Sequence, residues 1–251
     1  MKWMSFFLLF SAANSFAGVS IISDLDDTIK ITNAGNTLMA SYNGILKTKV
    51  FTAMPTFLAE SRSYTDELTI LSTSPFLIRP MVLRNFSEHD IDVDDVILKT
   101  KLLKNSHSFK VGKIREVLSR SNDDFILLGD DVNADVEVFD TIIKQFPKRI
   151  LVAYVHVVKG KKLPASVTPY FTAADLAMRE NLAGRMGPEG VMRVAEQVLE
   201  EPKMDRIFPG FAQCPRDPQG WNWVAASSWK PVSDQMVAKI NKYCGQRATQ
   251  K

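Results

Sequence analysis

The residues best suited to chemistry lie near the N-terminus, in Ser23-Asp-Leu-Asp-Asp-Thr28, directly after an apolar, β-branched run. Such a run predicts a buried strand that delivers its acids at the carboxyl end. On an extended chain Asp24 and Asp26 project to the same side, close enough to share one divalent cation, while Asp27 points to the other face. Because ligands of open α/β sheets bind beyond the strand ends, we expect phosphate and Mg²⁺ chemistry here. A solvated turn is the alternative interpretation.

A second predicted strand ends in hydroxyl groups. The stretch from Glu67 to Ser74 is apolar and then rich in Ser and Thr, and Pro75 suits the start of a helix that runs to about Ser87. The N–H groups at that helix start and the Ser72 hydroxyl could bind a phosphate oxygen. Ser and Thr are also ordinary N-cap residues, which is the structural alternative.

A third junction repeats this arrangement with acids. The apolar stretch 124–129 ends in a Gly that lets the backbone turn, and Asp130, Asp131 and Asp135 follow before an amphipathic helix that ends near Phe146. Asp130 comes immediately after the strand and is the best metal-ligand candidate of the three. Asp135 could instead be the N-cap of the helix.

A lysine near the start of another predicted helix also needs an explanation. Ser108 can cap a helix over residues 109–118, which places Lys110 in its first turn. The helix dipole favours acids at that end, so a role beyond helix stability is expected for this lysine. From the sequence alone, Lys113 could exchange roles with it.

Strands alternate with helices through most of the chain, which predicts an α/β fold. We expect a doubly wound, mainly parallel, Rossmann-like sheet over residues 18–158, with right-handed crossovers. A helix over 52–62 and strands over 96–98 and 149–158 belong to this core. Residues 159–251 form a helical, aromatic-rich C-terminal extension packed on the core.

The extension departs from the alternation of the core. Thr172-Ala-Ala-Asp175 resembles a capping box that opens a helix to about Met186, and residues 189–201 predict another helix. Ser233 can cap a final helix to about residue 243. The stretch 208–229 is loop-like and aromatic, which indicates either a small satellite core or an exposed patch that contacts a membrane or a lipid.

The ends of the chain indicate export. Residues 1–17 have a lysine, an apolar segment and small residues before Gly18, as in a cleavable signal peptide, so a periplasmic or secreted protein without a transmembrane segment is expected. The two cysteines, Cys214 and Cys244, should then pair, although two separate buried thiols remain the alternative. The net charge of +3 gives no argument for nucleic-acid binding.

Taken together, the motifs resemble the haloacid dehalogenase superfamily of phosphatases. They are most similar to the phosphatidate phosphatase catalytic-domain family of the actin-patch-associated type, over residues 19–158. The four similar motifs are Ser23-Asp-Leu-Asp-Asp-Thr-Ile-Lys30, Leu71-Ser-Thr-Ser-Pro-Phe76, Lys110-Val-Gly-Lys-Ile114 and Gly129-Asp-Asp131 with Asp135 and Glu137. The family usually has Trp where this chain has Phe76 and Ser where it has Asp131, and it often carries a preceding domain.

The resemblance implies four catalytic residues. Asp24 would attack phosphorus and form an aspartyl phosphate, which splits the displacement into two steps. Asp26 would protonate the leaving alkoxide and later accept a proton from the hydrolytic water. Ser72 and Lys110 would bind the transferring phosphoryl oxygens.

The resemblance also implies an Mg²⁺ site with oxygen ligands. Asp24, the backbone carbonyl of Asp26 and Asp130 would hold the ion. Asp131 and Asp135 would orient metal-bound waters or the lysine. The ion is needed because a carboxylate and a phosphate near contact repel one another by several kcal/mol at an effective dielectric constant of about 20.

The spacing of the motifs predicts an open site. The intervals between Thr28 and Ser72 and between Ser72 and Lys110 are each shorter than the roughly 50 residues of a small domain, so neither holds a large cap domain. We therefore expect an exported, Mg²⁺-dependent phosphatase that converts phosphatidate to diacylglycerol at a membrane surface. The alternatives are a phosphatase of nucleotides or phosphorylated polymers, and a lipid-binding module without turnover.

Overall fold

The computed structural model describes residues 18–34, 49–100, 105–215 and 228–249. The predicted signal peptide lies outside these residues, as do 35–48 and 101–104, so export and the lack of a large cap domain stay predictions. The elements, in chain order, are β1 (Val19–Ser23), α2 (Met54–Ser61), β2 (Glu67–Pro75), the 3-10 helix η1 (Phe76–Ile78), α3 (Arg79–Glu88), β3 (Asp95–Lys99), α4 (Ser106–Leu118), β4 (Asp124–Asp130), α5 (Asp135–Gln145), β5 (Ile150–His156), β6 (Thr168–Tyr170), α6 (Ala173–Leu182), α7 (Pro188–Glu200), the 3-10 helix η2 (Met204–Arg206) and α8 (Lys230–Thr249).

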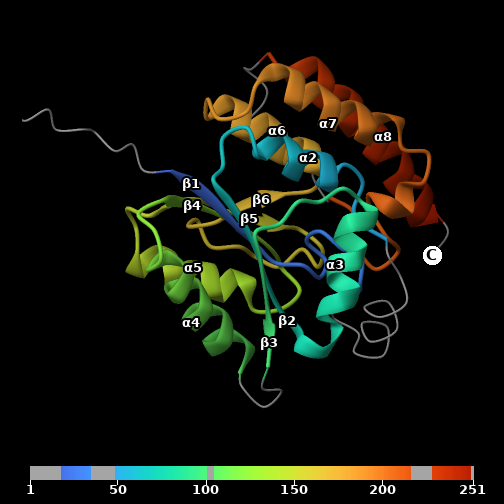
Figure 1. Ribbon diagram of the computed structural model, residues 1–251. Coiled ribbons are helices and arrows are strands. Elements are labelled where there is room, and N and C mark those ends of the chain that lie inside the picture. The colour runs from blue at the N-terminus through green and yellow to red at the C-terminus, as the bar shows by residue number, and fades with distance from the viewer. Residues whose placement is uncertain (1–17, 35–48, 101–104, 216–227, 250–251) are drawn as a thin grey trace, which may run out of the picture.

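Six parallel strands form one sheet in the order β3-β2-β1-β4-β5-β6 (Figure 1). The chain moves outward from β1 to β3 and then returns to the other side of β1 with β4. The predicted doubly wound, parallel sheet is therefore confirmed. The sequence did not predict β6, which has three residues and pairs with β5. The strand β6 lies beyond residue 158, so the sheet includes residues outside the predicted core of 18–158. The division of the chain into a core and an extension stays a prediction.

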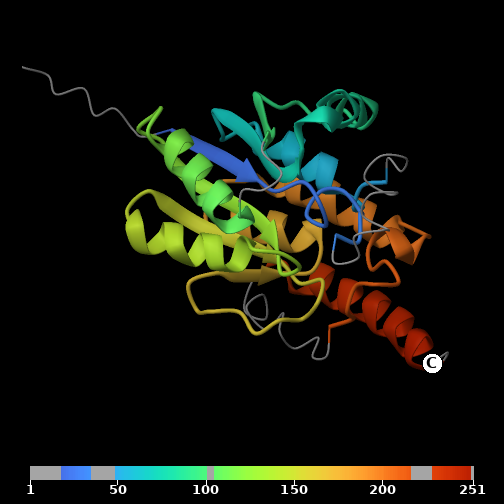
Figure 2. The ribbon, with the colours of Figure 1, turned by 90° about the horizontal axis from the view of Figure 1, so that it is seen from below.

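Helices cover both faces of the sheet because its strands are apolar on both sides. Ile21 belongs to one buried cluster and its neighbour Ile22 to the other, as expected for side chains that alternate along a strand. The helices α4 and α5 pack on the Ile22 face. The helices α2, α3 and α6 lie on the Ile21 face, with α7 and α8 outside them (Figures 1 and 2). This arrangement buries the strands and leaves their carboxyl ends as the place for a site.

Three predicted helix starts were wrong, and one of them changes an argument. Pro75 was expected to start a helix but is the last residue of β2, and α3 begins at Arg79 after the 3-10 helix η1. The helix α4 begins at Ser106, and the Asn105 side chain caps it by accepting a hydrogen bond of 3.2 Å from the Ser108 N–H. Lys110 is thus in the second turn, so the dipole at the helix start does not act on it as the sequence suggested. The helix α8 begins at Lys230, and Ser233 lies within it instead of capping it.

The expected start of α6 is confirmed. Asp175 accepts hydrogen bonds from the Phe171 N–H at 2.7 Å and from the Thr172 N–H at 2.9 Å, which holds the chain as it enters the helix. The predicted end near Met186 is too late, because α6 ends at Leu182.

The C-terminal extension is attached to the core by burial, and a disulfide links two of its own segments. Cys214 and Cys244 are bonded, which confirms the predicted pair. Phe208 and Trp229 are buried in the same apolar cluster as Ile21, and the Trp229 indole donates a hydrogen bond of 2.8 Å to Asn181. Among the described residues, these aromatic side chains thus pack as core; 216–227 lie outside them. No helix in the described ranges has the length and apolar character needed to cross a membrane.

Candidate active site

The ends of β1 and β4 bring two of the predicted acids together. These strands are neighbours with Ser23 opposite Leu128, and the Asp24 N–H donates a hydrogen bond of 2.8 Å to the Leu128 carbonyl. Asp24 follows β1 directly, and Asp130 is the last residue of β4. The two acids therefore lie at the point where the strand order reverses, which is the usual ligand-binding position of such sheets.

Asp135 joins these acids in a buried carboxylate cluster. One oxygen each of Asp24, Asp130 and Asp135 lies within 4.8 Å of the other two, and all three side chains are buried. Lys110 contacts Asp24 and Asp135, so the three acids and this lysine, all ionised, carry a net charge of −2. A buried excess of negative charge is costly, and oxygen ligands suit a hard divalent cation. The donor set thus fits a metal ion such as Mg²⁺.

Burial also shifts the ionisation of these acids. Removal from water, opposed by Lys110 and reinforced by the nearby carboxylates, raises the pKa of Asp24 to about 7. Burial and the charges of Asp135 and Asp24 raise the pKa of Asp130 well above its ordinary value. Both shifts favour protonation when no cation balances the cluster. A bound divalent cation would favour the ionised acids.

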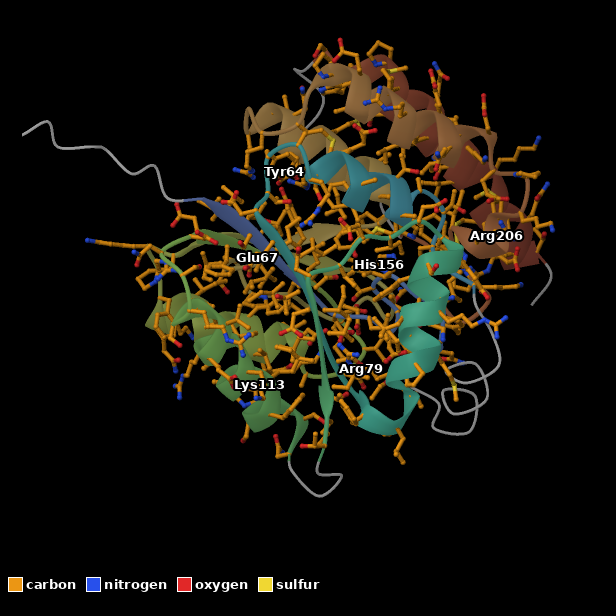
Figure 3. All side chains as sticks on the ribbon, in the orientation of Figure 1. Tyr64, Glu67, Arg79, Lys113, His156 and Arg206 are labelled. Carbon is orange, nitrogen blue, oxygen red and sulfur yellow. A yellow bond between two sulfur atoms is a disulfide. The ribbon has the colours of Figure 1, made fainter. Side chains whose placement is uncertain are left out.

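Lys110 is the lysine that reaches the cluster. Its ammonium group donates to Asp24 at 2.7 Å and also to Asp135. Burial alone would lower the pKa of Lys110, but the charges of Asp135, Asp24 and Asp130 together outweigh it and raise that pKa. Lys113 instead pairs with Glu116 at 2.6 Å on the surface of α4 (Figure 3). The structure therefore brings Lys110 to the candidate site and leaves Lys113 outside it.

Gly129 allows Asp135 to approach the strand. A β-carbon at this position would lie 2.8 Å from the Asp135 side chain and 2.8 Å from the Phe139 ring, which is closer than such contacts occur. Gly129 is inside β4, so it provides space for close packing and not the turn that the sequence suggested. Asp135 is the first residue of α5 and Ala134 the N-cap. Asp135 accepts from the Asp130 N–H at 3.3 Å, which links it to the strand end.

The Asp26 carboxylate contacts the end of β2 and is not one of the three clustered acids. Its carboxylate accepts hydrogen bonds from the hydroxyls of Ser72 at 3.1 Å and Ser74 at 2.8 Å. The expectation that the side chains of Asp24 and Asp26 project together assumed an extended chain, but β1 ends at Ser23. A metal contact through the Asp26 carbonyl stays a prediction. Sequence reasoning missed Ser74, although strand alternation places it on the same side as Ser72.

Asp27 and Asp131 organise loops. Asp27, at φ 59°, accepts backbone hydrogen bonds of 2.9, 2.8 and 2.6 Å from residues 32, 33 and 34. Asp131 accepts three, of 2.8, 2.7 and 2.9 Å, from residues 158, 159 and 161. The Asp131 carboxylate is thus occupied by the loop after β5 and is not part of the cluster of three acids. A contribution of Asp131 to the metal site stays a prediction.

A buried histidine supports the loop that carries the acids. His156 contacts the Asp27 carbonyl at 2.7 Å through Nδ1, which must donate because a carbonyl only accepts. Its ring packs edge-on against Phe51 at 4.6 Å and stacks on Tyr170 at 4.9 Å between ring centres. Burial lowers the pKa of His156, so the neutral ring is favoured. The Thr28 hydroxyl adds a 3.5 Å contact to Asp130.

Lys30 is a second buried cation, and it lies in the loop that follows β1. The sequence analysis gave it no role. Burial lowers the pKa of Lys30, and the charge of Asp26 opposes that shift. Its backbone N–H donates to the Leu25 carbonyl at 2.9 Å, and its carbonyl accepts from the Asp27 N–H at 2.7 Å. Lys30 therefore belongs to the structure of the loop that places Asp24 and Asp26.

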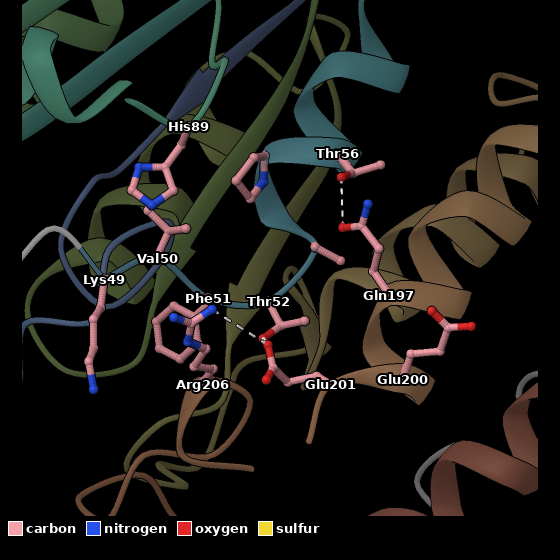
Figure 4. Close-up of a pocket in the computed structure, with 12 residues that line it drawn as sticks. Lys49, Val50, Phe51, Thr52, Thr56, His89, Gln197, Glu200, Glu201 and Arg206 are labelled. Atoms are coloured by element: carbon pink, nitrogen blue, oxygen red, sulfur yellow. Dashed lines mark hydrogen bonds and ion pairs between the residues drawn. The ribbon is translucent and has the colours of Figure 1, made fainter. Parts of the chain in front are cut away.

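A surface pocket of about 440 Å³ lies beside this region, between α2, α7 and η2 (Figure 4). Its wall includes Phe51, Thr52, Glu201 and Arg206, and the Thr52 hydroxyl donates to Glu201 at 3.0 Å. None of the predicted catalytic or metal-binding residues lines it. We therefore assign the chemistry to the carboxylate cluster, where the reactive groups are.

Comparison with protein families gives a match for this chain. The family described as "Phosphatidate phosphatase APP1, catalytic domain" matches residues 19–157, which is more than half of the chain. A solved structure titled "Structure of Pnkp1/Rnl/Hen1 complex" is similar at 18% identity with a TM-score of 0.41, and the match covers 61% of this chain and 52% of that chain. That structural likeness is too low to support an argument. The comparison with curated proteins gave no match.

Proposed function

From the premise that this chain belongs to the phosphatidate phosphatase APP1 catalytic-domain family, we propose that it is an exported, Mg²⁺-dependent enzyme that hydrolyses phosphatidate to diacylglycerol and phosphate. The observation that carries the proposal is the convergence of Asp24, Asp130 and Asp135 on Lys110 at the ends of β1 and β4. This cluster has a nucleophile, a cation and oxygen ligands for a metal at one place.

The proposed reaction has two displacements at phosphorus. An oxygen of Asp24 bonds to phosphorus while the bond from phosphorus to the glycerol oxygen breaks, and Asp26 donates its proton to that oxygen. Asp26 then accepts a proton from water, whose oxygen bonds to phosphorus while the bond from Asp24 to phosphorus breaks, which releases inorganic phosphate and returns the Asp24 carboxylate. Ser72 and Ser74 orient the Asp26 carboxylate through their hydrogen bonds.

The positive charges at the site have separate tasks in this proposal. Lys110, held between Asp24 and Asp135, is placed to bind the phosphoryl oxygens on which charge spreads in the transition state. Mg²⁺, held by Asp24 and Asp130 with Asp135 beside them, would neutralise the excess acidic charge and allow an anionic substrate to approach.

The test compares phosphate release from phosphatidate vesicles with release from soluble phosphomonoesters, with Mg²⁺ and with EDTA. Asp24→Asn should abolish hydrolysis, because the amide is not a nucleophile. Asp90→Asn is the matched control: it makes the same change in charge at a turn residue with φ 54°, a conformation that Asn tolerates, and should keep full activity.

Each proposed feature can fail separately. Turnover confined to nucleotides or phosphorylated polymers would refute the lipid substrate and leave the phosphatase. Full activity of Asp24→Asn would show that the nucleophile is another residue. Binding of phosphatidate without turnover under all conditions would favour a lipid-binding module. Retention of the protein in the cytoplasm with residues 1–17 intact would refute export.

A further inference from the structure

An exposed apolar surface lies directly beside the candidate active site. Among the described residues, six large apolar side chains are more than a third exposed, and four of them are in η1 and α3. These are Phe76, Leu77, Met81 and Leu83, with exposed fractions of 52%, 86%, 43% and 36%. We call these four residues the η1–α3 face. Such a group on a short segment is unusual, because exposed apolar residues are normally scattered.

The η1–α3 face is not the core-facing side of its helix. Val82 and Phe86 turn inward and are 2% and 1% exposed. Phe76 and Leu77 precede α3 in η1, and at about 100° per residue Met81 and Leu83 lie on the two flanks of the buried stripe of α3. The segment therefore carries apolar side chains outside its buried stripe, and these exposed side chains have no packing role in the fold of the described residues.

The chain connects this face to the residues that hold Asp26. Ser72 and Ser74 end β2 and donate to the Asp26 carboxylate, and Phe76 follows Ser74 by two residues. Two residues of extended chain span at most about 7 Å. A surface that receives the η1–α3 face must therefore lie close to the site where phosphate would bind.

The charged residues within the segment are basic. No acidic residue occurs between Pro75 and Ser87, whereas Arg79 and Arg84 both lie in α3. Arg79 is the first residue of α3 (Figure 3). Glu88, at the end of the helix, pairs with Arg84 at 2.8 Å. Apolar side chains flanked by arginines match a surface that is apolar inside and anionic outside.

We propose that the η1–α3 face inserts into the surface of an anionic phospholipid bilayer and thereby presents lipid phosphate groups to Asp24 and Ser72. The proposal rests on the proposed lipid substrate and adds the surface through which the enzyme meets it. It assigns membrane contact to this face; among the described aromatic residues of the C-terminal extension, Phe208 and Trp229 are buried in the core.

The first experiment measures flotation of the full mature chain with vesicles of equal parts phosphatidylcholine and phosphatidylglycerol. These vesicles contain no phosphatidate, so binding is separated from turnover. Replacing both Phe76 and Leu77 by Ser should weaken binding by roughly tenfold or more, since both side chains would leave the membrane. The matched control replaces both Leu151 and Leu182 by Ser. These residues are 42% and 49% exposed and lie outside the η1–α3 face, so the control should bind as the wild type does.

The second experiment measures activity on two substrates. The Phe76→Ser, Leu77→Ser variant should hydrolyse a soluble ester such as p-nitrophenyl phosphate at the wild-type rate, because neither residue touches the carboxylate cluster. Its rate on phosphatidate in vesicles should fall about as much as its binding. If the wild type hydrolyses no phosphatidate at all, the proposed function fails, while vesicle binding through this face can still be observed.

A reporter variant covers the case in which the double variant does not fold. Leu77→Trp keeps a large apolar residue, and its emission should move to shorter wavelength with vesicles and be quenched by brominated lipid. Equal vesicle binding by the wild type and a folded double variant would overturn the proposal. So would a Trp at residue 77 that brominated lipid does not quench, and capture of the face by a protein instead of vesicles.

Discussion

Replacing Asp24 with Asn should stabilise the metal-free protein at alkaline pH while it abolishes hydrolysis. Burial raises the pKa of Asp24 from 3.8 to about 7, so ionising this group in the folded state opposes folding. An acid with a raised pKa contributes its stability fully below pH 3.8 and loses it as the pH rises through about 7. At 1.36 kcal/mol per pKa unit, the ionised group costs roughly 4 kcal/mol above that pH.

Thermal unfolding in EDTA at pH 5 and pH 8 measures this cost. About 2.6 kcal/mol of this cost develops between pH 5 and pH 8, because the unfolded-state carboxyl is already mostly ionised at pH 5. For a chain of this size, 1 kcal/mol corresponds to about 2–4 °C, so Asp24 alone should lower the wild-type melting temperature by roughly 5–10 °C between these pH values. The melting temperature of Asp24→Asn should fall much less between the two pH values, and at pH 8 it should lie above that of the wild type. Asp90→Asn, a surface control, should follow the wild type at both pH values.

Added Mg²⁺ completes the test. A cation binds the ionised acids, so its stabilising effect on the wild type should be larger at pH 8 than at pH 5, and smaller at both in Asp24→Asn. If Asp24→Asn melts below the wild type in EDTA at pH 8, the buried carboxylates do not carry a destabilising excess of negative charge. The argument for a divalent cation would then lose its electrostatic basis.

Three further predictions concern single elements of the structure. Lys110→Met should lower turnover by about 100-fold or more, whereas Lys113→Met should leave it unchanged, as steady-state kinetics would show. Asp131→Ala should destabilise the fold by about 1–3 kcal/mol in urea unfolding, because it releases three backbone N–H groups. Replacing Cys214 and Cys244 together with Ser should cost about 3–4 kcal/mol of stability for a loop of this length, without loss of activity.

The sequence alone was enough for the order of the motifs and for the fold class. Apolar runs that end in Asp24, Ser72 and Asp130 predict strands whose tips meet at one edge, because parallel strands point the same way. The same local signals predicted the entry into α6 at Asp175. The pairing of Cys214 with Cys244 was predicted from the expected export to an oxidising compartment and from the presence of only two cysteines.

The direction of each acid was decided by the tertiary structure. Asp26 binds Ser72 and Ser74 of β2, and Asp131 binds the loop after β5. Alternation along a strand cannot give these partners, since it stops where the strand ends.

Long-range packing also chose the members of the carboxylate cluster. Asp135 reaches Lys110 because Gly129 leaves space beside the strand. From the sequence, this glycine was expected to form a turn. The sequence thus determined which residues arrive at the edge of the sheet. Only the folded chain decided which of their oxygens face one another, because side-chain directions beyond a strand depend on partners far away in sequence.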